Sequence, residues 1–126
     1  MITVAVIGLL VSVALVNYQS MLRKAEDAST FGNLGSLRSA LSIYYGENEQ
    51  FPRDGLESIT AGWRYLQEMA VMKTTMHSPT TAVTTEAVPS EAGRWSYSHN
   101  DGEETWGKIT VGCLHRDTRG VIWSSY

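Results

Sequence analysis

Cys113, His115 and Asp117 come closest, by type and spacing, to a group of residues that does chemistry. Cys113 and His115 are two positions apart, so their side chains share one face if this segment is a strand. A thiol beside an imidazole is typical of a nucleophile pair, and the carboxylate would extend the group to a metal site. A small buried thiol beside a rim histidine explains the same residues. His77, His99 and His115 lack the paired spacing typical of zinc ligands, and we expect no metal, no cofactor and no catalytic residue.

Acidic residues near the C-terminal end are candidates for a second kind of site. They are Asp101, Glu103, Glu104 and Asp117. Such carboxylates can gather around Ca²⁺, a hard cation that needs several oxygen ligands, but we favour a charged hairpin turn. The sequence contains no Gly-x-Ser-x-Gly elbow, no His-Glu-x-x-His and no phosphate-binding loop. We therefore expect that the protein is not an enzyme.

Composition limits the classes of protein to which the chain can belong. Its 126 residues are enough for one small domain beyond a long helix. The formal net charge of −3 offers no basic field for nucleic acid, so we expect no nucleic-acid partner. Cys113 is the only cysteine, which excludes an intrachain disulfide.

The element that organises the chain begins with an uncharged apolar run from Ile2 to Val16. No Gly or Pro stands between Asn17 and Ala28, so nothing there ends a helix that begins in the apolar run. We predict one long helix, apolar in its first half and amphipathic in its second. Fifteen residues rise roughly 22 Å, which is short of the about 30 Å of a bilayer's hydrocarbon core.

The apolar run has two other interpretations. A buried core helix fits its length, but a small domain could hardly surround a helix that shows no polar face over four turns. A secretory signal peptide also fits the length, but it needs a basic n-region and a small-residue cleavage site. Neither feature is convincing in this sequence.

From Ala28 to Tyr45, apolar residues recur at steps of three and four, which marks one face of an amphipathic helix. They are Phe31, Leu34, Leu37, Leu41 and Tyr44. This face needs a sheet to cover it. We therefore divide the chain into two parts. Residues 1–27 are the hydrophobic half of the helix, which would lie in the membrane or in the core of a filament, and residues 28–126 are a globular head.

The head is predicted to continue with a short helix and a loop. Four apolar residues share a helical face after the break at Phe51-Pro52, with Gly62 as an interruption: Ile59, Trp63, Leu66 and Ala70. The Thr- and Ser-rich segment from Thr74 to Ser90 is predicted to be a surface loop with one short strand at 82–84. Its hydroxyls are also compatible with O-linked sugar.

Strands are predicted in the C-terminal third. Large aromatic and small polar residues alternate from Arg94 to His99, which is typical of a half-buried strand. Asp101-Gly102 favours a turn, and the return strand is predicted from Trp106 to Cys113. A third strand is predicted from Val121 to Trp123. The fold class is therefore α+β, with a long N-terminal helix packed on a small antiparallel β-sheet.

The run from Val6 to Gln19, continuing into Arg23-Lys24-Ala25, resembles the N-terminal helix of type IV pilins and type II secretion pseudopilins. Tyr44-Tyr45 followed by Phe51-Pro52 strengthens the resemblance, because the helix of this family tends to end in a Tyr-rich turn before an aromatic-Pro pair. The resemblance implies a pilin-like fold, with a basic leader and a few more mature residues expected ahead of Met1. About six such residues would extend the apolar segment to roughly 30 Å. Major pilins often close a C-terminal disulfide loop, which a chain with one cysteine must replace in another way.

Filament formation in this family implies that copies of the apolar helix pack together. Gly8 and Ser12 lie four apart and would let helix backbones approach closely. A positive pair at 23–24 on one copy would meet a negative pair at 26–27 on another and set the axial register. The residues assigned to filament assembly are Ile2, Ile7, Gly8, Leu9, Ser12, Leu15, Arg23, Lys24, Glu26 and Asp27.

The resemblance thus implies a structural subunit of a type IV pilus-like filament, a homo-oligomer that polymerises through its N-terminal helix. We expect the precursor in the bacterial inner membrane, handled by a pilus or secretion assembly platform. The filament itself would be extracellular or periplasmic. A pseudopilin of a type II secretion system and a singly membrane-anchored periplasmic binding module are the alternatives.

Overall fold

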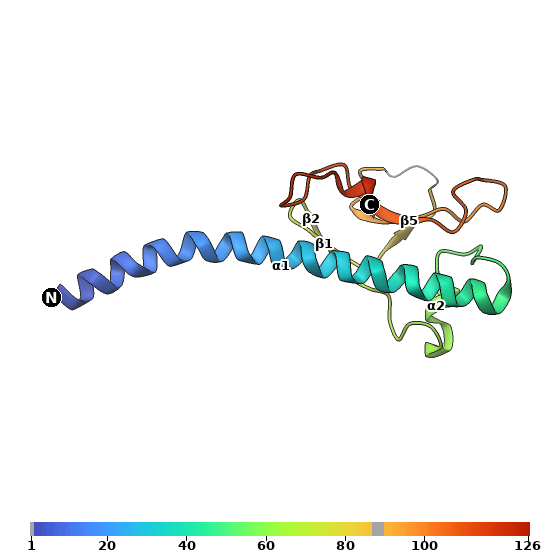
Figure 1. Ribbon diagram of the computed structural model, residues 1–126, viewed down its shortest axis with the longest axis horizontal. Helices are drawn as coiled ribbons and strands as arrows, with labels where there is room; N and C mark the ends of the chain where they lie inside the picture. The colour runs from blue at the N-terminus through green and yellow to red at the C-terminus, as the bar shows by residue number, and fades with distance from the viewer. Residues whose placement is uncertain (1, 87–89) are drawn as a thin grey trace.

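The computed structural model describes residues 2–86 and 90–126. Helix α1 (Ile2–Asn48) is a single helix of 47 residues, and its C-terminal part lies along a small β-sheet head while its N-terminal part projects away from it (Figure 1). The predicted α+β fold, with a long N-terminal helix packed on a small sheet, is confirmed. No Pro interrupts the segment, and Asn48 is followed by Glu49 at positive φ, where the helix ends.

The C-terminal half of α1 buries the face that its periodicity predicts. Leu34, Leu37 and Leu41 are 2%, 0% and 3% exposed, while Phe31 and Tyr44 lie partly buried at the margin of the core. These residues recur at three- and four-residue steps and so point to one side of the helix. The predicted phase of the amphipathic helix is therefore confirmed.

Polar side chains of α1 fix the helix on the first strand, β1 (Met72–Thr74). The Thr30 hydroxyl donates to the carbonyl of Lys73 and accepts its N–H, and the Asn33 amide donates to the carbonyl of Val71 at 2.6 Å. Thr30 is fully buried, so these bonds satisfy groups that burial would otherwise penalise. The helix is thus fixed on the head by hydrogen bonds as well as by apolar contact.

The strands form two small sheets. Strand β1 pairs antiparallel with β2 (His77–Thr80). In the second sheet β4 (Arg94–Tyr97) lies between β3 (Val83–Thr84) and β5 (Ile109–Gly112). The β4–β5 pair is antiparallel, as predicted, whereas the short β3–β4 pair is parallel.

Large aromatic residues of β4 fill the space between the sheet and the helix. Trp95 and Tyr97 are both fully buried. The Trp95 indole N–H donates to the carbonyl of Ala70 at 2.7 Å, and the Tyr97 hydroxyl donates to the carbonyl of Pro52 at 2.7 Å. Burial raises the pKa of the Tyr97 phenol, so it stays a neutral donor. The Phe51-Pro52 pair noted in the sequence is therefore a point where the chain is fixed to β4.

Four expectations about secondary structure are wrong in part. The short helix ends early: α2 (Glu57–Thr60) passes into a 3₁₀ turn, η1 (Ala61–Trp63), where Gly62 has a φ of 68°. The expected loop from Thr74 contains strand β2, because antiparallel pairing with β1 supplies an order that composition does not reveal. Its residues 87–89 lie outside the described part of the chain.

The third error concerns the C-terminal end. The expected strand from Val121 to Trp123 is a single bridge between Arg116 and Ile122 followed by a 3₁₀ turn, η2 (Trp123–Ser125). Trp123 is fully buried there and stacks on Phe31 of α1, with ring centroids 4.8 Å apart. Packing of one large aromatic ring on the helix thus prevails over the β-propensity of Val-Ile-Trp.

Strand β5 begins later than predicted, at Ile109 instead of Trp106. Gly107 has a φ of 80°, and a Cβ at this position would lie 2.4 Å from the Phe51 ring. The backbone therefore turns tightly over Phe51, which only glycine permits. Trp106 packs edge-on against the same ring, 5.7 Å between centroids, instead of extending the strand.

Candidate assembly surface

The apolar half of α1 is exposed all round. Every described side chain from Ile2 to Glu26 is exposed, and none of the most hydrophobic window of the helix is buried in the subunit. Among the residues assigned to assembly, the exposed fractions are 82% for Ile2, 60% for Ile7, 70% for Leu9 and 59% for Leu15. By length and composition this helix is able to cross a membrane. Such a surface is unfavourable in water and needs lipid or protein to cover it.

Gly8 and Ser12 lie on this exposed helix with nothing packed against them. Apart from the adjacent turns of the helix itself, no atom of the described residues lies within 4 Å of the position that a Cβ on Gly8 would occupy. The Ser12 hydroxyl donates to the carbonyl of Leu9 at 2.8 Å, so its hydrogen is satisfied within the helix. Both residues are therefore compatible with an apolar surrounding and with close approach of another helix.

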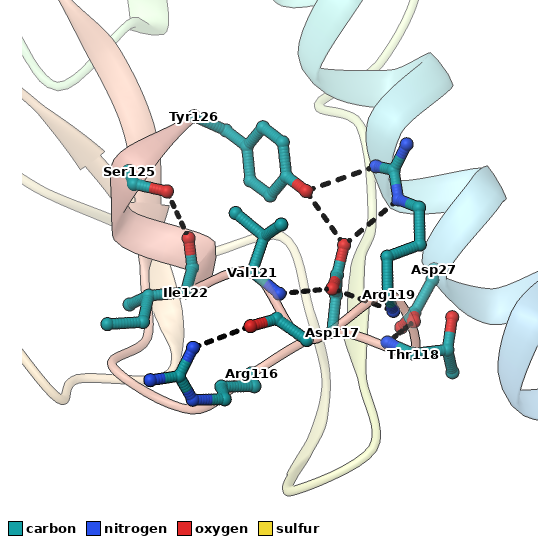
Figure 2. A network of polar contacts seen from close by, with 10 residues as sticks. Asp27, Arg116, Asp117, Thr118, Arg119, Val121, Ile122, Ser125 and Tyr126 are labelled. Atoms are coloured by element: carbon teal, nitrogen blue, oxygen red, sulfur yellow. Dashed lines mark hydrogen bonds and ion pairs between the residues drawn. The ribbon is translucent and has the colours of Figure 1, made fainter.

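The charged residues that follow do not form one exposed cluster. Arg23, Lys24 and Glu26 are exposed, but Asp27 is only 3% exposed. The Asp27 carboxylate accepts the N–H of Thr118 at 2.8 Å, across a separation of 91 residues (Figure 2). The structure thus places Asp27 in a contact between helix and head, which the sequence did not suggest. Whether Asp27 also contacts another copy stays a prediction.

The C-terminal loop that meets Asp27 is held by Asp117, whose side chain is buried (Figure 2). Its carboxylate accepts the N–H groups of Arg119 and Val121 at 2.9 and 2.8 Å. It also accepts the Tyr126 hydroxyl at 2.8 Å and the Arg119 guanidinium at 3.2 Å. One carboxylate thus joins the loop to the last residue of the chain, in a chain that has no disulfide to do so.

The same contacts set the ionisation of Asp117. Burial opposes the charged form, but the N–H of Val121, the Tyr126 hydroxyl and Arg119 together outweigh it, so the pKa of this carboxyl lies below its ordinary value. A lowered pKa in the folded state stabilises the fold above the unfolded-state pKa of about 3.9, and this contribution is lost as the pH falls further. Acid should therefore loosen the C-terminal loop below about pH 4.

Asp117→Asn is expected to lower the free energy of unfolding at pH 7 by about 1–3 kcal/mol, because the amide cannot accept from all the donors that face it. Because asparagine does not titrate, the stability of the variant should also fall less than that of the wild type when the pH drops below about 4. Thermal unfolding at several pH values measures both effects. A stability and a pH profile equal to those of the wild type would contradict the role given to this carboxylate.

A groove runs between α1 and the C-terminal loop, with a volume of about 840 Å³. It is lined by Lys24, Asp27, Ala28, Phe31, Thr118, Arg119 and Tyr126. The Arg119 guanidinium lies 4.3 Å from the centroid of the Phe31 ring, which is a cation–π contact. The groove lies where the exposed part of α1 meets the head. Its lining includes both positive and aromatic side chains.

A second group of residues is brought together outside the groove and the Asp117 network. His77, Glu91, Cys113 and His115 place their ligand atoms within 4.8 Å of one another, although the sequence led us to expect no metal ligands. Asp117, the carboxylate that would have extended the Cys113–His115 pair to a metal site, belongs to the loop network instead. Burial raises the pKa of the Cys113 thiol, which is the reverse of what activates a nucleophile.

Comparison with known protein families, with curated proteins and with solved structures found no match. Function is therefore argued from the residues and their arrangement. The exposed apolar half-helix is the feature that any function must explain, because it is the part of the described chain that cannot remain in water.

Proposed function

We propose that the chain is a structural subunit of a type IV pilus-like filament that polymerises through the N-terminal half of α1. The exposed apolar surface of that half-helix carries the proposal. Residues 2–26 extend about 37 Å along the helix, and the first charged residue is Arg23. A helix of this kind anchors the precursor in the inner membrane, and it leaves the bilayer when other copies replace the lipid around it.

The outer face of the C-terminal half of α1 also supports packing between copies. Opposite the buried leucines lie exposed residues that are uncharged and, except for Ile43, small: Ala25, Ser29, Gly32, Ser36, Ser39, Ile43 and Gly46. The hydroxyls of Ser36 and Ser39 donate to carbonyls one turn earlier, at 3.1 and 3.0 Å. Beyond the neighbouring turns of the helix, no atom in the described part of the chain lies within 4 Å of a Cβ added at Gly32 or Gly46. This face thus lets another helix approach closely without burying a charge.

Charge reversal at the border of the apolar half tests the proposal. Arg23→Glu with Lys24→Glu is expected to weaken filament formation, because a positive pair on one copy would no longer meet Glu26 on another. An exposed ion pair contributes about 1 kcal/mol at most, but the contact repeats with every subunit. Adding Glu26→Lys should restore part of the assembly. Asp27 is left unchanged, because its contact with Thr118 lies within the subunit.

The measurement is the yield of filaments sheared from cells that express each full-length variant at equal protein level. Arg94→Glu with Lys108→Glu is the matched control, since it reverses two exposed charges on the head and should leave the yield unchanged. A normal yield from the Arg23/Lys24 variant would reject the role of these charges in setting the register.

A secretion pseudopilin would assemble through the same surface, so the end use must be separated by its effect on cells. Long surface threads seen by electron microscopy favour a pilus. Loss of enzyme secretion on deletion of the gene, without threads, favours a pseudopilus. Protein that stays in the membrane as a monomer under all conditions would favour the singly anchored binding module over either filament.

A further inference from the structure

His77, Glu91, Cys113 and His115 form a compact cluster from segments that are distant in the sequence. His77 begins β2, Glu91 precedes β4, and Cys113 and His115 follow the end of β5. Cys113 is fully buried, His77 and His115 are partly buried, and Glu91 covers them from the solvent side. Imidazole nitrogen, thiolate sulfur and carboxylate oxygen are the ligand atoms that zinc takes in proteins.

The distances within the cluster suit a small tetrahedral ion. Glu91 Oε1 lies 2.9 Å from His77 Nε2 and 2.8 Å from His115 Nδ1, and Cys113 Sγ lies 3.5 Å from His115 Nδ1. Ligand atoms around tetrahedral zinc are about 3.3–3.7 Å apart, given bonds of about 2.0–2.3 Å. Since no pair in the cluster exceeds 4.8 Å, side-chain movements of about 1 Å bring all four atoms to bonding distance.

The surroundings hold the ligands in place. The second oxygen of Glu91 accepts the N–H of Leu114 at 2.8 Å, which leaves Oε1 directed at the two histidines. A Cβ at Gly93 would lie 2.6 Å from His77 Nδ1, so glycine at this position leaves room for the imidazole. Such supporting contacts orient metal ligands and raise affinity.

We propose that His77, Glu91, Cys113 and His115 bind one Zn²⁺ ion with tetrahedral N₂SO coordination. The donor set selects zinc over Ca²⁺ and Mg²⁺, because those hard cations prefer oxygen ligands alone. On binding, Cys113 loses the thiol proton to solvent and its sulfur forms the bond to the metal. The binding of imidazole, carboxylate and thiolate at all four positions leaves no open position, which is typical of a structural site.

The ion would join two parts of the head that belong to different β-sheets. His77 belongs to the β1–β2 sheet, whereas the other three ligands flank the β4–β5 pair of the second sheet. The chain has one cysteine and so no intrachain disulfide. Zinc at this position would link the two sheets and stabilise the head by mass action.

Zinc binding is measured on the full chain in detergent micelles, by titration with ZnCl₂ in competition with a chromophoric chelator. We expect one ion per chain, and a thermal midpoint that rises by about 10 °C or more when free zinc is 100 times the dissociation constant. EDTA should return the midpoint to its starting value. With Co²⁺ as the probe, the intense visible bands of tetrahedral cobalt and a sulfur-to-cobalt charge-transfer band should appear.

Substitutions assign the ligands. His77→Gln and Glu91→Gln should each weaken zinc binding by more than about tenfold, and Cys113→Ser should remove the charge-transfer band. His99→Gln is the matched control, because His99 is a partly buried histidine outside the cluster. Each variant is first shown to unfold cooperatively in EDTA. Since the partly exposed Glu91 has little packing to lose, Glu91→Gln tests the site even if the buried thiol cannot be replaced.

Zinc affinity that is the same in the His77, Glu91 and His99 variants would overturn the proposal, as would the absence of tetrahedral cobalt bands in the wild type. The cluster would then be a set of histidine–glutamate ion pairs beside a buried thiol. Neither result bears on filament assembly, which is measured separately by the yield of sheared filaments.

Discussion

Leu37→Asp is expected to unfold the head at room temperature. Leu37 is fully buried on the face of α1 that contacts the sheets, and the variant would place an unpaired carboxylate there. Loss of the leucine costs about 2–5 kcal/mol and burial of an unpaired charge costs several kcal/mol more, so the sum is comparable to the total stability of a small domain, which begins at about 5 kcal/mol. The N-terminal half of the helix should still insert in micelles, because its described side chains from Ile2 to Glu26 are exposed in the subunit.

Ser36→Asp is the matched control, since it adds the same carboxylate one position away on the exposed side of the helix. It gives up only the hydroxyl bond to Gly32 and should change stability by less than about 1 kcal/mol. Unfolding is followed through fluorescence of Trp95 and Trp123, which are buried in the head. Equal thermal midpoints for the two variants would mean that the helical phase is wrong.

Deletion of residues 1–18 is expected to convert a protein that requires detergent into a soluble, folded monomer. The removed segment carries most of the exposed large apolar side chains of the helix, and all of its described side chains are exposed. The contacts that hold α1 on the head begin at Asp27 and Thr30, well beyond the cut. The truncated chain should therefore keep the stability of the head while it loses the ability to bind membranes and to polymerise.

Size-exclusion chromatography without detergent, near-ultraviolet circular dichroism and thermal unfolding measure this result. The near-ultraviolet spectrum should match that of the full chain in micelles, because the tryptophans all lie in the head. A truncated product that aggregates or lacks a cooperative transition would contradict the division of the helix into an exposed half and a packed half.

Local patterns determined the elements in which one periodicity dominates. The apolar run and the three- and four-residue spacing from Phe31 to Tyr44 predicted α1 and its buried face. Alternation predicted β4, and the return strand predicted from Trp106 to Cys113 contains its partner β5. Each of these signals lies within a window of about ten to twenty residues, so the chain needs no distant contact to express it.

Long-range packing decided the elements in which the local signal is weak. Strand β2 exists because β1 pairs with it, and the C-terminal end forms η2 because Trp123 packs on Phe31. Sequence reasoning had expected a loop in the first case and a strand in the second. Short segments gain too little from local preference to resist such contacts.

The sequence by itself determined that the chain carries an apolar helix, an amphipathic continuation and a small sheet. Only the tertiary structure decided that Asp27 turns inward to Thr118, and that His77 and Glu91 meet Cys113 and His115. The physical reason is that helix and strand periods act between near neighbours, whereas these side chains come from segments distant in the sequence and meet only when the chain is folded. Spacing along the chain therefore marked Cys113 and His115 as a pair, but it gave no sign of their contact with His77 and Glu91 or of the contact between Asp27 and Thr118.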